Sequence, residues 1–575
     1  MRVSGWTAGA DALARFPDLA VLSLAGVSGL PPGLLARSSR LTELVLRDGA
    51  SPVPTLRNLP LKRLELRNLQ AGVGGGLAEC FRGLRALENL VIHNVRGLTS
   101  LAVGALRDLE SLIEIRVEMN RDLEALPDAL LPASRDLRVM QILGNGRLTA
   151  LAPGWFKDKP ELVDCRIVAN GITSLRSDTF DHHPRIRFLI LNGNRLRFEE
   201  AGTRPLQQMF KGLPNLQEIE MDSNELDDIP LGAFDSLKGI QLISLKSQRG
   251  KGLRSLHPNL FRCNKMLASI RLMGNQLTHV PPDLLHGLTL MTKVDLSMNP
   301  ALQAIPNNFF KDAPNMFKLY LYGTSISQLT PRMFGLLAKL GRFRTENCKI
   351  TRIDPATLSG WTSLTHLDLA GNALTEIGEG TFADLVGLRV LELQGNRLTS
   401  LPKAVLRPLT GLTRLTLSQR SPPGGAAAAD GVSGCLRAEE LPDSAGKLMA
   451  RGCFAADPEY RQCMDPEDAR VQEQCAPGAG GLAHPLRDPA AAPLRISNTA
   501  SGGRSHSRGE RAAADVNRNG LLFPSSRILS GASVQYLGFV SSVALGAACL
   551  GHKVLARRRS GRGQARRRGP GGRGR

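Results

Sequence analysis

Apolar residues recur along this chain in one pattern, L-x-x-L-x-L-x-x-N-x-L, and most intervals between its starts are 24 or 25 residues. The clearest unit, LTHLDLAGNALTEIGEGTFADLVG, begins at Leu364. Apolar and polar residues alternate in the first seven positions, as they do in a strand with one buried face. A repeat of this kind predicts a solenoid in which each unit packs only on its neighbours. The seventeen starts are Leu19, Leu41, Leu61, Leu87, Leu112, Leu137, Leu162, Ile186, Leu216, Ile240, Leu267, Met291, Met316, Leu340, Leu364, Leu388 and Leu412.

The spacing assigns a role to each position of the unit. Positions one, four and six point inward, and the strands of successive units should lie side by side in a parallel sheet, about 4.8 Å apart. The asparagine at position nine can bond backbone groups that the bend would otherwise bury without partners. It occurs as Asn120, Asn145, Asn170, Asn194, Asn224, Asn275, Asn299, Asn372 and Asn396.

Some units depart from the pattern. Cys348 stands at position nine of one unit, so we interpret it as a structural residue. The unit from Ile240 loses its asparagine and carries extra residues, and the unit from Ile186 is stretched to 30 residues. About fifteen residues into many units a phenylalanine recurs, which predicts a second buried spine beneath the convex side: Phe156, Phe180, Phe234, Phe310, Phe334 and Phe382.

Over about residues 19–418 the repeat resembles the leucine-rich-repeat family, and it looks most like the roughly 24-residue class found in ectodomains such as those of Toll-like receptors and Slit. The resemblance implies an α/β repeat solenoid, a leucine-rich-repeat horseshoe with a parallel sheet on its concave face. It also implies a protein that grips a protein, glycan or lipid-bearing ligand with that face.

Residues 1–18 have no apolar run, so we expect an N-terminal segment there, interpreted as a truncated cap. The solenoid of about 17 repeats should follow at residues 19–420. Residues 19–36 are uncharged, which leaves a signal segment as the alternative to a first repeat.

Residues 421–476 begin as a linker, SPPGGAAAADG, and then carry four clustered cysteines, Cys435, Cys453, Cys463 and Cys475. The cluster resembles the disulfide-bonded C-terminal caps of extracellular leucine-rich repeats, although their C-x-C start and Trp are absent. This resemblance implies two disulfides in an oxidising compartment, with unpaired thiols and a metal site as alternatives.

Residues 477–527 are rich in Gly, Ala, Pro, Ser and Arg and are expected to form a flexible stalk. The next segment, 528–552, contains no Asp, Glu, Lys or Arg and is long enough to cross about 30 Å as a helix. We expect a C-terminal single transmembrane helix there, because no further domain remains to bury it. Small residues every four positions would allow two such helices to pair in a homodimer.

The net charge of +21 is concentrated at the C-terminus, where residues 553–575 carry ten basic residues and no acid. Next to a membrane span, such a segment predicts a cytoplasmic tail that attracts anionic lipid, at about 1 kcal/mol per basic residue. An RNA-binding or nuclear-localising tail is the alternative. We favour anchoring, and therefore expect no nucleic-acid ligand.

Catalytic motifs are missing from the sequence: it has no HExxH, GxxxxGK[ST], GxSxG or EF-hand loop, and no CxxC pair. We therefore expect no catalytic residue, no metal site and no cofactor. The chain should not be an enzyme, and any signalling would require a partner.

Positions three, five and seven of each unit should project from the concave strands into solvent, which selects the candidate ligand-binding residues. Tyr and Arg are residue types that anchor interfaces. Ordinary solvated positions are the alternative interpretation. The candidates are an acidic group, Glu218, Glu220 and Asp222, and a basic–aromatic group, Arg271, Lys293, Lys318, Tyr320, Tyr322, Arg342 and Arg344.

Two functions fit these features. The preferred one is a receptor or adhesion protein of the plasma membrane, single-pass with its N-terminal side outward, that recognises a protein or glycan ligand. The absence of a clear signal segment and of any N-x-[ST] site speaks against it. The alternative is an intracellular scaffold for protein–protein interaction, tail-anchored in an internal membrane by residues 528–552. A soluble RNA-associated scaffold is a third interpretation.

Overall fold

The computed structural model describes residues 2–4, 13 and 15–417, apart from residues 27–33, 36–37, 50–55, 73–76, 78–79, 129, 151, 176–178, 182 and 198–209. The predicted cap-like region, stalk, transmembrane helix and basic tail lie outside the described residues. Among the helices that are described, none is long and apolar enough to cross a membrane.

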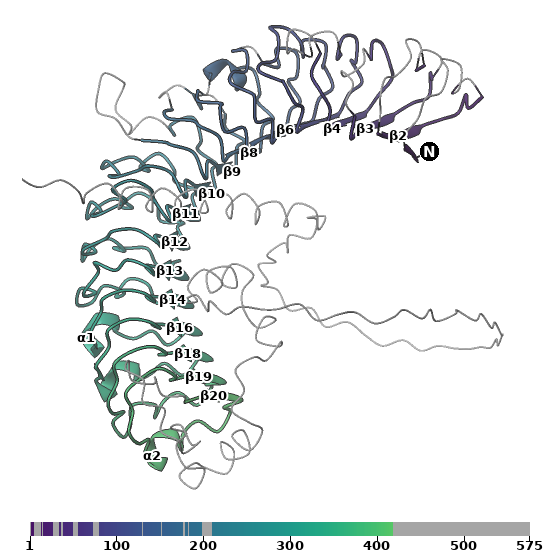
Figure 1. Cartoon of the computed structure of the whole chain (residues 1–575). Helices are drawn as coiled ribbons and strands as arrows, with labels where there is room; N and C mark the ends of the chain where they lie inside the picture. Colours follow the sequence, from purple (N-terminus) through teal and green to yellow (C-terminus); the bar gives the residue numbers. More distant parts are fainter. Residues whose placement is uncertain are drawn as a thin grey trace, which may run out of the picture. The chain divides into compact units, whose positions relative to one another are not determined.

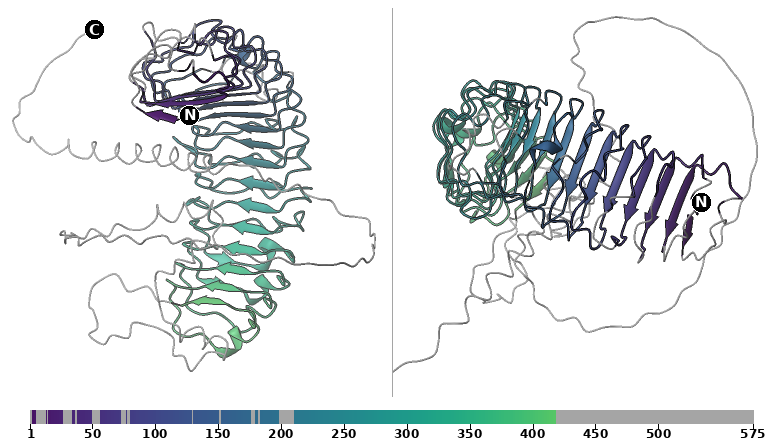
Figure 2. Two further views of the ribbon diagram at one scale, coloured as in Figure 1. Left: turned by 90° about the vertical axis from the view of Figure 1, so that its right-hand side faces the viewer. Right: turned by 90° about the horizontal axis from the view of Figure 1, so that it is seen from above.

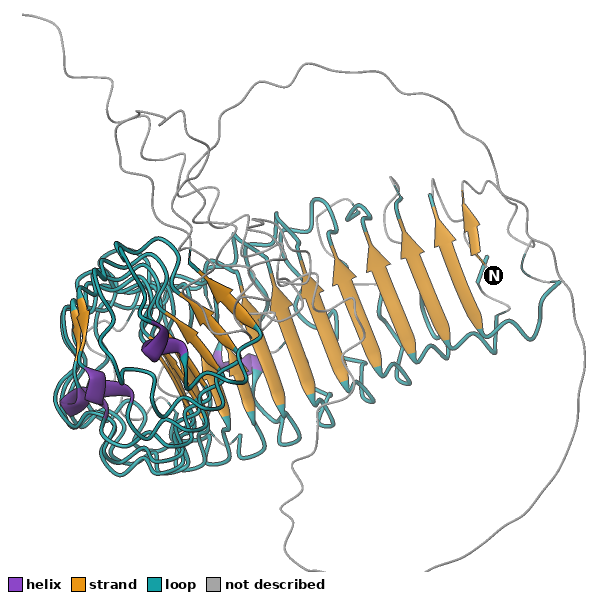
Figure 3. Ribbon diagram, turned by 90° about the horizontal axis from the view of Figure 1, so that it is seen from below, coloured by secondary structure: helices purple, strands orange, loops and turns teal. Residues whose placement is uncertain are grey.

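The described chain winds into a row of turns, and each turn contributes a strand to one parallel sheet (Figure 1). The strands lie side by side along the concave side of this row (Figure 2), and loops form most of the opposite side (Figure 3). The sheet has 18 strands, which are β1 (Arg2–Ser4), β2 (Val21–Ala25), β3 (Glu43–Arg47), β4 (Arg63–Arg67), β5 (Asn89–His93), β6 (Glu114–Glu118), β7 (Val139–Leu143), β8 (Asp164–Val168), β9 (Phe188–Ile190), β10 (Glu218–Glu220), β11 (Leu242–Ser244), β12 (Ser269–Arg271), β13 (Lys293–Asp295), β14 (Lys318–Tyr320), β16 (Arg342–Arg344), β18 (His366–Asp368), β19 (Val390–Glu392) and β20 (Arg414–Thr416).

The predicted repeat register is confirmed. Each of the seventeen starts lies two residues before a strand, so the irregular early units also form strands β2 to β5. The segment before the first repeat adds one strand that the pattern did not predict, because β1 pairs in parallel with β2. Short elements occupy the other side of the turns: η1 (Pro153–Trp155), η3 (Pro355–Leu358), α1 (Pro331–Phe334), α2 (Lys403–Leu406) and the paired strands β15 (Gln328–Leu329) and β17 (Arg352–Ile353).

The core is a column of aliphatic side chains that runs through the repeats. In the unit from Leu364, the first, fourth and sixth residues, Leu364, Leu367 and Leu369, are fully buried. Full burial of a leucine contributes about 1.5–3 kcal/mol, so the small contribution of each layer adds up over the array.

The predicted asparagine ladder is also confirmed. Each of the nine asparagines is buried and donates from Nδ2 to a carbonyl of the preceding repeat, as Asn299 does to Leu272 at 3.1 Å. In the unit that loses its asparagine, Gln248 takes its place and donates to the carbonyl of Met221 at 2.8 Å. Cys348 also has the predicted structural role, since its Sγ lies 3.1 Å from the carbonyl oxygen of Leu321.

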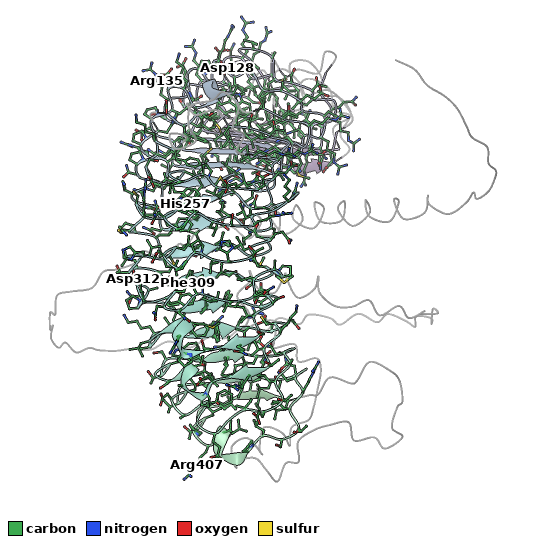
Figure 4. All side chains as sticks on the ribbon, turned by 90° about the vertical axis from the view of Figure 1, so that its left-hand side faces the viewer. Asp128, Arg135, His257, Phe309, Asp312 and Arg407 are labelled. Carbon is green, nitrogen blue, oxygen red and sulfur yellow. The ribbon has the colours of Figure 1, made fainter. Side chains whose placement is uncertain are left out.

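The outer side has its own regular contacts. The six predicted spine phenylalanines are buried, and Phe234 stacks between Phe210 and Phe261 with ring centroids 6.4 and 6.0 Å away. Aspartates bind backbone N–H groups of a neighbouring turn: Asp128 accepts from Gly154 and Asp312 from Gly287 (Figure 4).

Candidate functional site

The acidic candidates lie on and just after β10, and they are tied into the sheet rather than projecting freely. Glu220 binds Arg271, two strands along the sheet, with 3.2 Å between Oε1 and Nη1. Burial, followed by the charge and hydrogen bond of Glu220, raises the pKa of Glu218 to about 7. The two glutamates therefore share a proton near neutral pH.

Asp222 was expected in solvent, and this expectation is wrong: its side chain is buried. The carboxylate accepts hydrogen bonds from the Ser244 hydroxyl at 2.6 Å and from the backbone N–H of Lys246 at 2.7 Å. It also pairs with the Lys246 ammonium at 3.2 Å. Asp222 thus connects two repeats, because a buried carboxylate requires partners of this kind.

The basic–aromatic candidates come together on β13, β14 and β16. Tyr320 and Tyr322 are buried rather than exposed, so the predicted projection into solvent is wrong for both rings. The physical reason is the narrow spacing of the strands, which lets long neighbouring side chains cover a ring. The Lys293 Nζ lies 5.3 Å from the Tyr320 centroid, and the Arg344 guanidinium lies 5.8 Å from it. The same guanidinium lies 4.9 Å from the Tyr322 centroid.

The remaining basic candidates keep their predicted place. Lys318 and Arg342 occupy the third position of their units, in register with Lys293, and all three are half-buried. Arg271 is half-buried two strands from Glu220. The structure therefore separates the candidates into an acidic group on β10, bonded to Arg271, and a basic–aromatic group on β13 to β16.

Carboxylates line the sheet beside the basic–aromatic group. Glu346 pairs with Arg344, and Asp368 lies 3.9 Å from the same guanidinium. Burial raises the pKa of Glu346, and burial together with the charges of Glu346 and Glu392 raises the pKa of Asp368 well above its usual range. Glu346, Asp368 and Glu392, which we call the carboxylate group, are all more than four-fifths excluded from solvent.

The sequence-based selection missed part of this surface. Asp368, Glu392, His366 and Arg414 occupy the third and fifth positions of the last three units, in register with Arg342 and Arg344. The repeat register would have selected them if it had been applied to those units. Within the described chain, no group of three or more His, Cys, Asp or Glu side chains is arranged to hold a metal ion.

Comparison with known proteins places these features in a family. The leucine rich repeat family model matches residues 345–398 and 362–419. The chain is 28% identical over 206 residues to leucine-rich repeat-containing G-protein coupled receptor 5 of Xenopus tropicalis, a match that covers 29% of this chain and 22% of the receptor. It is also 28% identical to mouse podocan over 187 residues and to chicken lumican over 198 residues.

These matches are partial. They cover 32% of this chain and 28% of podocan, and 33% of this chain and 52% of lumican, so the chain matches about half or less of each relative's length. The relatives belong to non-enzymatic families, which supports the expectation that the chain is not an enzyme.

Solved structures share the fold. The Drosophila Toll protein, in a structure of the Toll–Spatzle complex, aligns with a TM-score of 0.52 and 18% identity over 72% of this chain and 58% of that chain. A repeat protein of Leptospira interrogans aligns with a TM-score of 0.55 and 20% identity over 70% of this chain and 97% of that chain.

Proposed function

We propose that this chain, a leucine-rich-repeat protein with relatives among extracellular-type binding proteins, is a membrane-anchored receptor or adhesion protein that binds a protein ligand on its concave sheet. The ligand would contact the surface around β13, β14 and β16. Signalling would pass through partner proteins, because the sequence contains no catalytic motif.

The observation that carries this proposal is the cluster of Lys293, Tyr320, Tyr322 and Arg344. Two rings and two cations from three adjacent repeats contact one another at 4.9–5.8 Å. Aromatic and arginine side chains dominate the energetics of protein interfaces. Side chains already held by neighbours lose less entropy on binding, so such a cluster favours affinity.

The relatives support a protein ligand over other classes. The Toll structure is of a complex with Spatzle, and one relative is named as a G-protein coupled receptor. The fold likeness to Toll covers most of the described residues of this chain. We therefore favour a protein ligand, and a glycan is the alternative occupant of the same surface.

Anchoring is proposed from residues outside the described part of the chain. The uncharged segment 528–552 followed by the basic residues 553–575 supports a single span with an inward tail. The solenoid would then face outward from the plasma membrane. In the alternative, an intracellular tail-anchored scaffold, the same segment would leave the solenoid in the cytosol.

Topology is the first test. Epitope tags at both ends of the full chain would be stained in intact and in permeabilised cells. We expect the N-terminal tag to stain without permeabilisation and the C-terminal tag to require it. If neither tag stains until cells are permeabilised, the surface-receptor proposal fails for those cells.

The ligand surface needs a second test. Cells displaying the full chain would be screened against a library of secreted proteins, and each binder would be titrated against Lys293→Gln and Arg344→Gln variants. We expect at least tenfold weaker binding, because the cations that order both rings are lost. Arg332→Gln, an exposed change in α1 on the outer side, is the matched control. Binding that responds equally to all three changes would place the ligand elsewhere.

A further inference from the structure

A second group of cations lies on the last repeats, next to the proposed ligand surface. Arg342 on β16 pairs in register with His366 on β18, and Val390 on β19 separates His366 from Arg414 on β20. Arg389 immediately precedes β19. Because adjacent strands are about 4.8 Å apart, three guanidiniums can reach the imidazole. We call Arg342, His366, Arg389 and Arg414 the Arg–His cluster.

Hydrogen bonding determines which nitrogen of His366 carries the proton. The Thr365 hydroxyl donates to the carbonyl of Gly341 at 2.8 Å, so its only hydrogen is used. The same oxygen lies 2.8 Å from His366 Nδ1 and must accept from it. The neutral ring therefore carries Nδ1–H, and its Nε2 is left with a lone pair. None of the described residues forms a hydrogen bond with Nε2.

The charges around this ring are mainly positive. Burial, followed by the charges of Arg342, Arg389 and Arg414, lowers the pKa of His366 to about 4. The ring is therefore neutral at physiological pH, although an anion beside it would reverse the balance. The other charged groups on neighbouring elements are Lys318 on β14, Arg344 on β16, Asp368 on β18, Glu392 on β19, and Glu346 just after β16.

We propose that the Arg–His cluster is an anion-binding subsite that takes carboxylate side chains from an acidic segment of the protein ligand, and that binding strengthens on acidification. This inference rests on the proposed function, because it assigns a ligand chemistry to the same concave sheet. Arg342, Arg389 and Arg414 attract the carboxylate. His366 then gains a proton at Nε2 and donates to it.

The surroundings favour a protein segment over a polyanionic glycan. The carboxylate group, Glu346, Asp368 and Glu392, lies directly beside the Arg–His cluster, two to four residues along the same strands. A uniformly anionic chain would place negative charge against both surfaces. A protein segment can present acids to the cluster and neutral or basic side chains to the carboxylates, which matches this two-sided surface.

The size of the pH effect follows from linkage. If a bound carboxylate restores the imidazole to the ordinary histidine pKa of about 6.5, then binding should be about tenfold tighter at pH 5.5 than at pH 7.5. Glutamate side chains, with an ordinary pKa of about 4.3, remain largely ionised at both values. The direction of the effect therefore reports on the cluster and not on the probe.

The test uses the full chain in detergent and a fluorescein-labelled octaglutamate peptide, followed by fluorescence anisotropy at pH 7.5 and 5.5. The wild type should bind about tenfold more tightly at pH 5.5. His366→Gln should bind equally at the two pH values, because glutamine does not titrate. Arg342→Gln with Arg414→Gln should weaken binding at both, at least tenfold. Arg138→Gln with Arg187→Gln, exposed arginines that precede β7 and β9, is the matched control and should change nothing.

A second variant guards against misfolding of His366→Gln, which the unfolding temperature would reveal. Arg389→Gln removes an exposed cation from beside the ring, so the midpoint of the pH dependence should move to higher pH. Binding that does not vary with pH in the wild type, or that the control pair also weakens, overturns the proposal. Tight binding of a heparin oligosaccharide without binding of octaglutamate would replace the protein segment by a glycan. Loss of this subsite while Arg344→Gln still abolishes ligand binding would leave the proposed function standing.

Discussion

The ladder at position nine shows at the residue scale how much chemistry a repeat pattern specifies. The nine asparagines could be predicted because the position needs a donor and an acceptor in the bend. That Gln248 fills the same place, and that Thr324 and Cys348 share a contact of 3.2 Å in two neighbouring units, could not be predicted. A longer or weaker donor satisfies the bend only if the local backbone adjusts, and the pattern carries no information on that adjustment.

Asn299 offers a direct test of the ladder. Its Nδ2 donates to three carbonyls, those of Leu272, Leu296 and Ser297, and its Oδ1 accepts from the backbone N–H of Leu277. Asn299→Ala leaves these buried groups without partners, so the free energy of unfolding should fall by about 3 kcal/mol in urea titrations. The exposed Asn259→Ala should change it by less than about 0.5 kcal/mol. Equal effects of the two changes would mean that the ladder does not stabilise the array.

Asp368 gives a prediction on pH. Burial and the charges of Glu346 and Glu392 raise its folded-state pKa well above the unfolded value of about 3.9. The folded state then binds more protons than the unfolded state, so this carboxyl makes the free energy of unfolding fall as pH rises above about 4. Asp368→Asn does not titrate and should gain stability relative to the wild type between pH 4.5 and pH 8.

Urea titrations at those two pH values measure this difference. Glu379→Gln, which changes an exposed acid in the same repeat, is the control and should follow the wild type at both. If the Asp368→Asn and wild-type curves are parallel, then the carboxyl of Asp368 is not held neutral in the folded protein.

At the scale of the element, strands were predictable and exposure was not. The register located all seventeen repeat strands because the inward positions are periodic. The same register wrongly placed Tyr320, Tyr322 and Asp222 in solvent. Whether an outward side chain is covered depends on the length and charge of its neighbours on adjacent strands, which lie about 24 residues away in sequence. A periodic pattern within one repeat does not contain those neighbours.

The phenylalanine spine predicts an element-scale effect. Phe234 is fully buried and stacks on Phe210 and Phe261, so Phe234→Ala opens a cavity shared by three repeats. The cost should be about 3–5 kcal/mol, and since each repeat contacts only its neighbours, protection from hydrogen exchange should be lost first around β10 to β12. Phe317→Ala removes a ring that is 49% exposed and should cost far less. Loss of protection spread evenly over the array would contradict nearest-neighbour packing.

For the whole molecule, the sequence supports statements that the described residues do not reach. The fold of residues 21–416 followed from periodicity, and the aromatic–cation cluster lies where the register put its members. The Arg–His cluster was missed because histidine and arginine are ordinary at any single position. Only their pairing across β16 to β20 brings them together.

The cysteines provide the last prediction, because their state depends on the compartment in which the chain folds. If the chain is exported, Cys435, Cys453, Cys463 and Cys475 should form two disulfides. The chain has nine cysteines, so nine less four leaves about five thiols that react in denaturant without reductant. These five include Cys165 and Cys348, which are free thiols buried in the repeats. After reduction all nine should react, as counted by mass spectrometry of the alkylated protein. Nine reactive thiols before reduction would instead favour the tail-anchored scaffold, since the reducing cytosol keeps such a cluster unpaired.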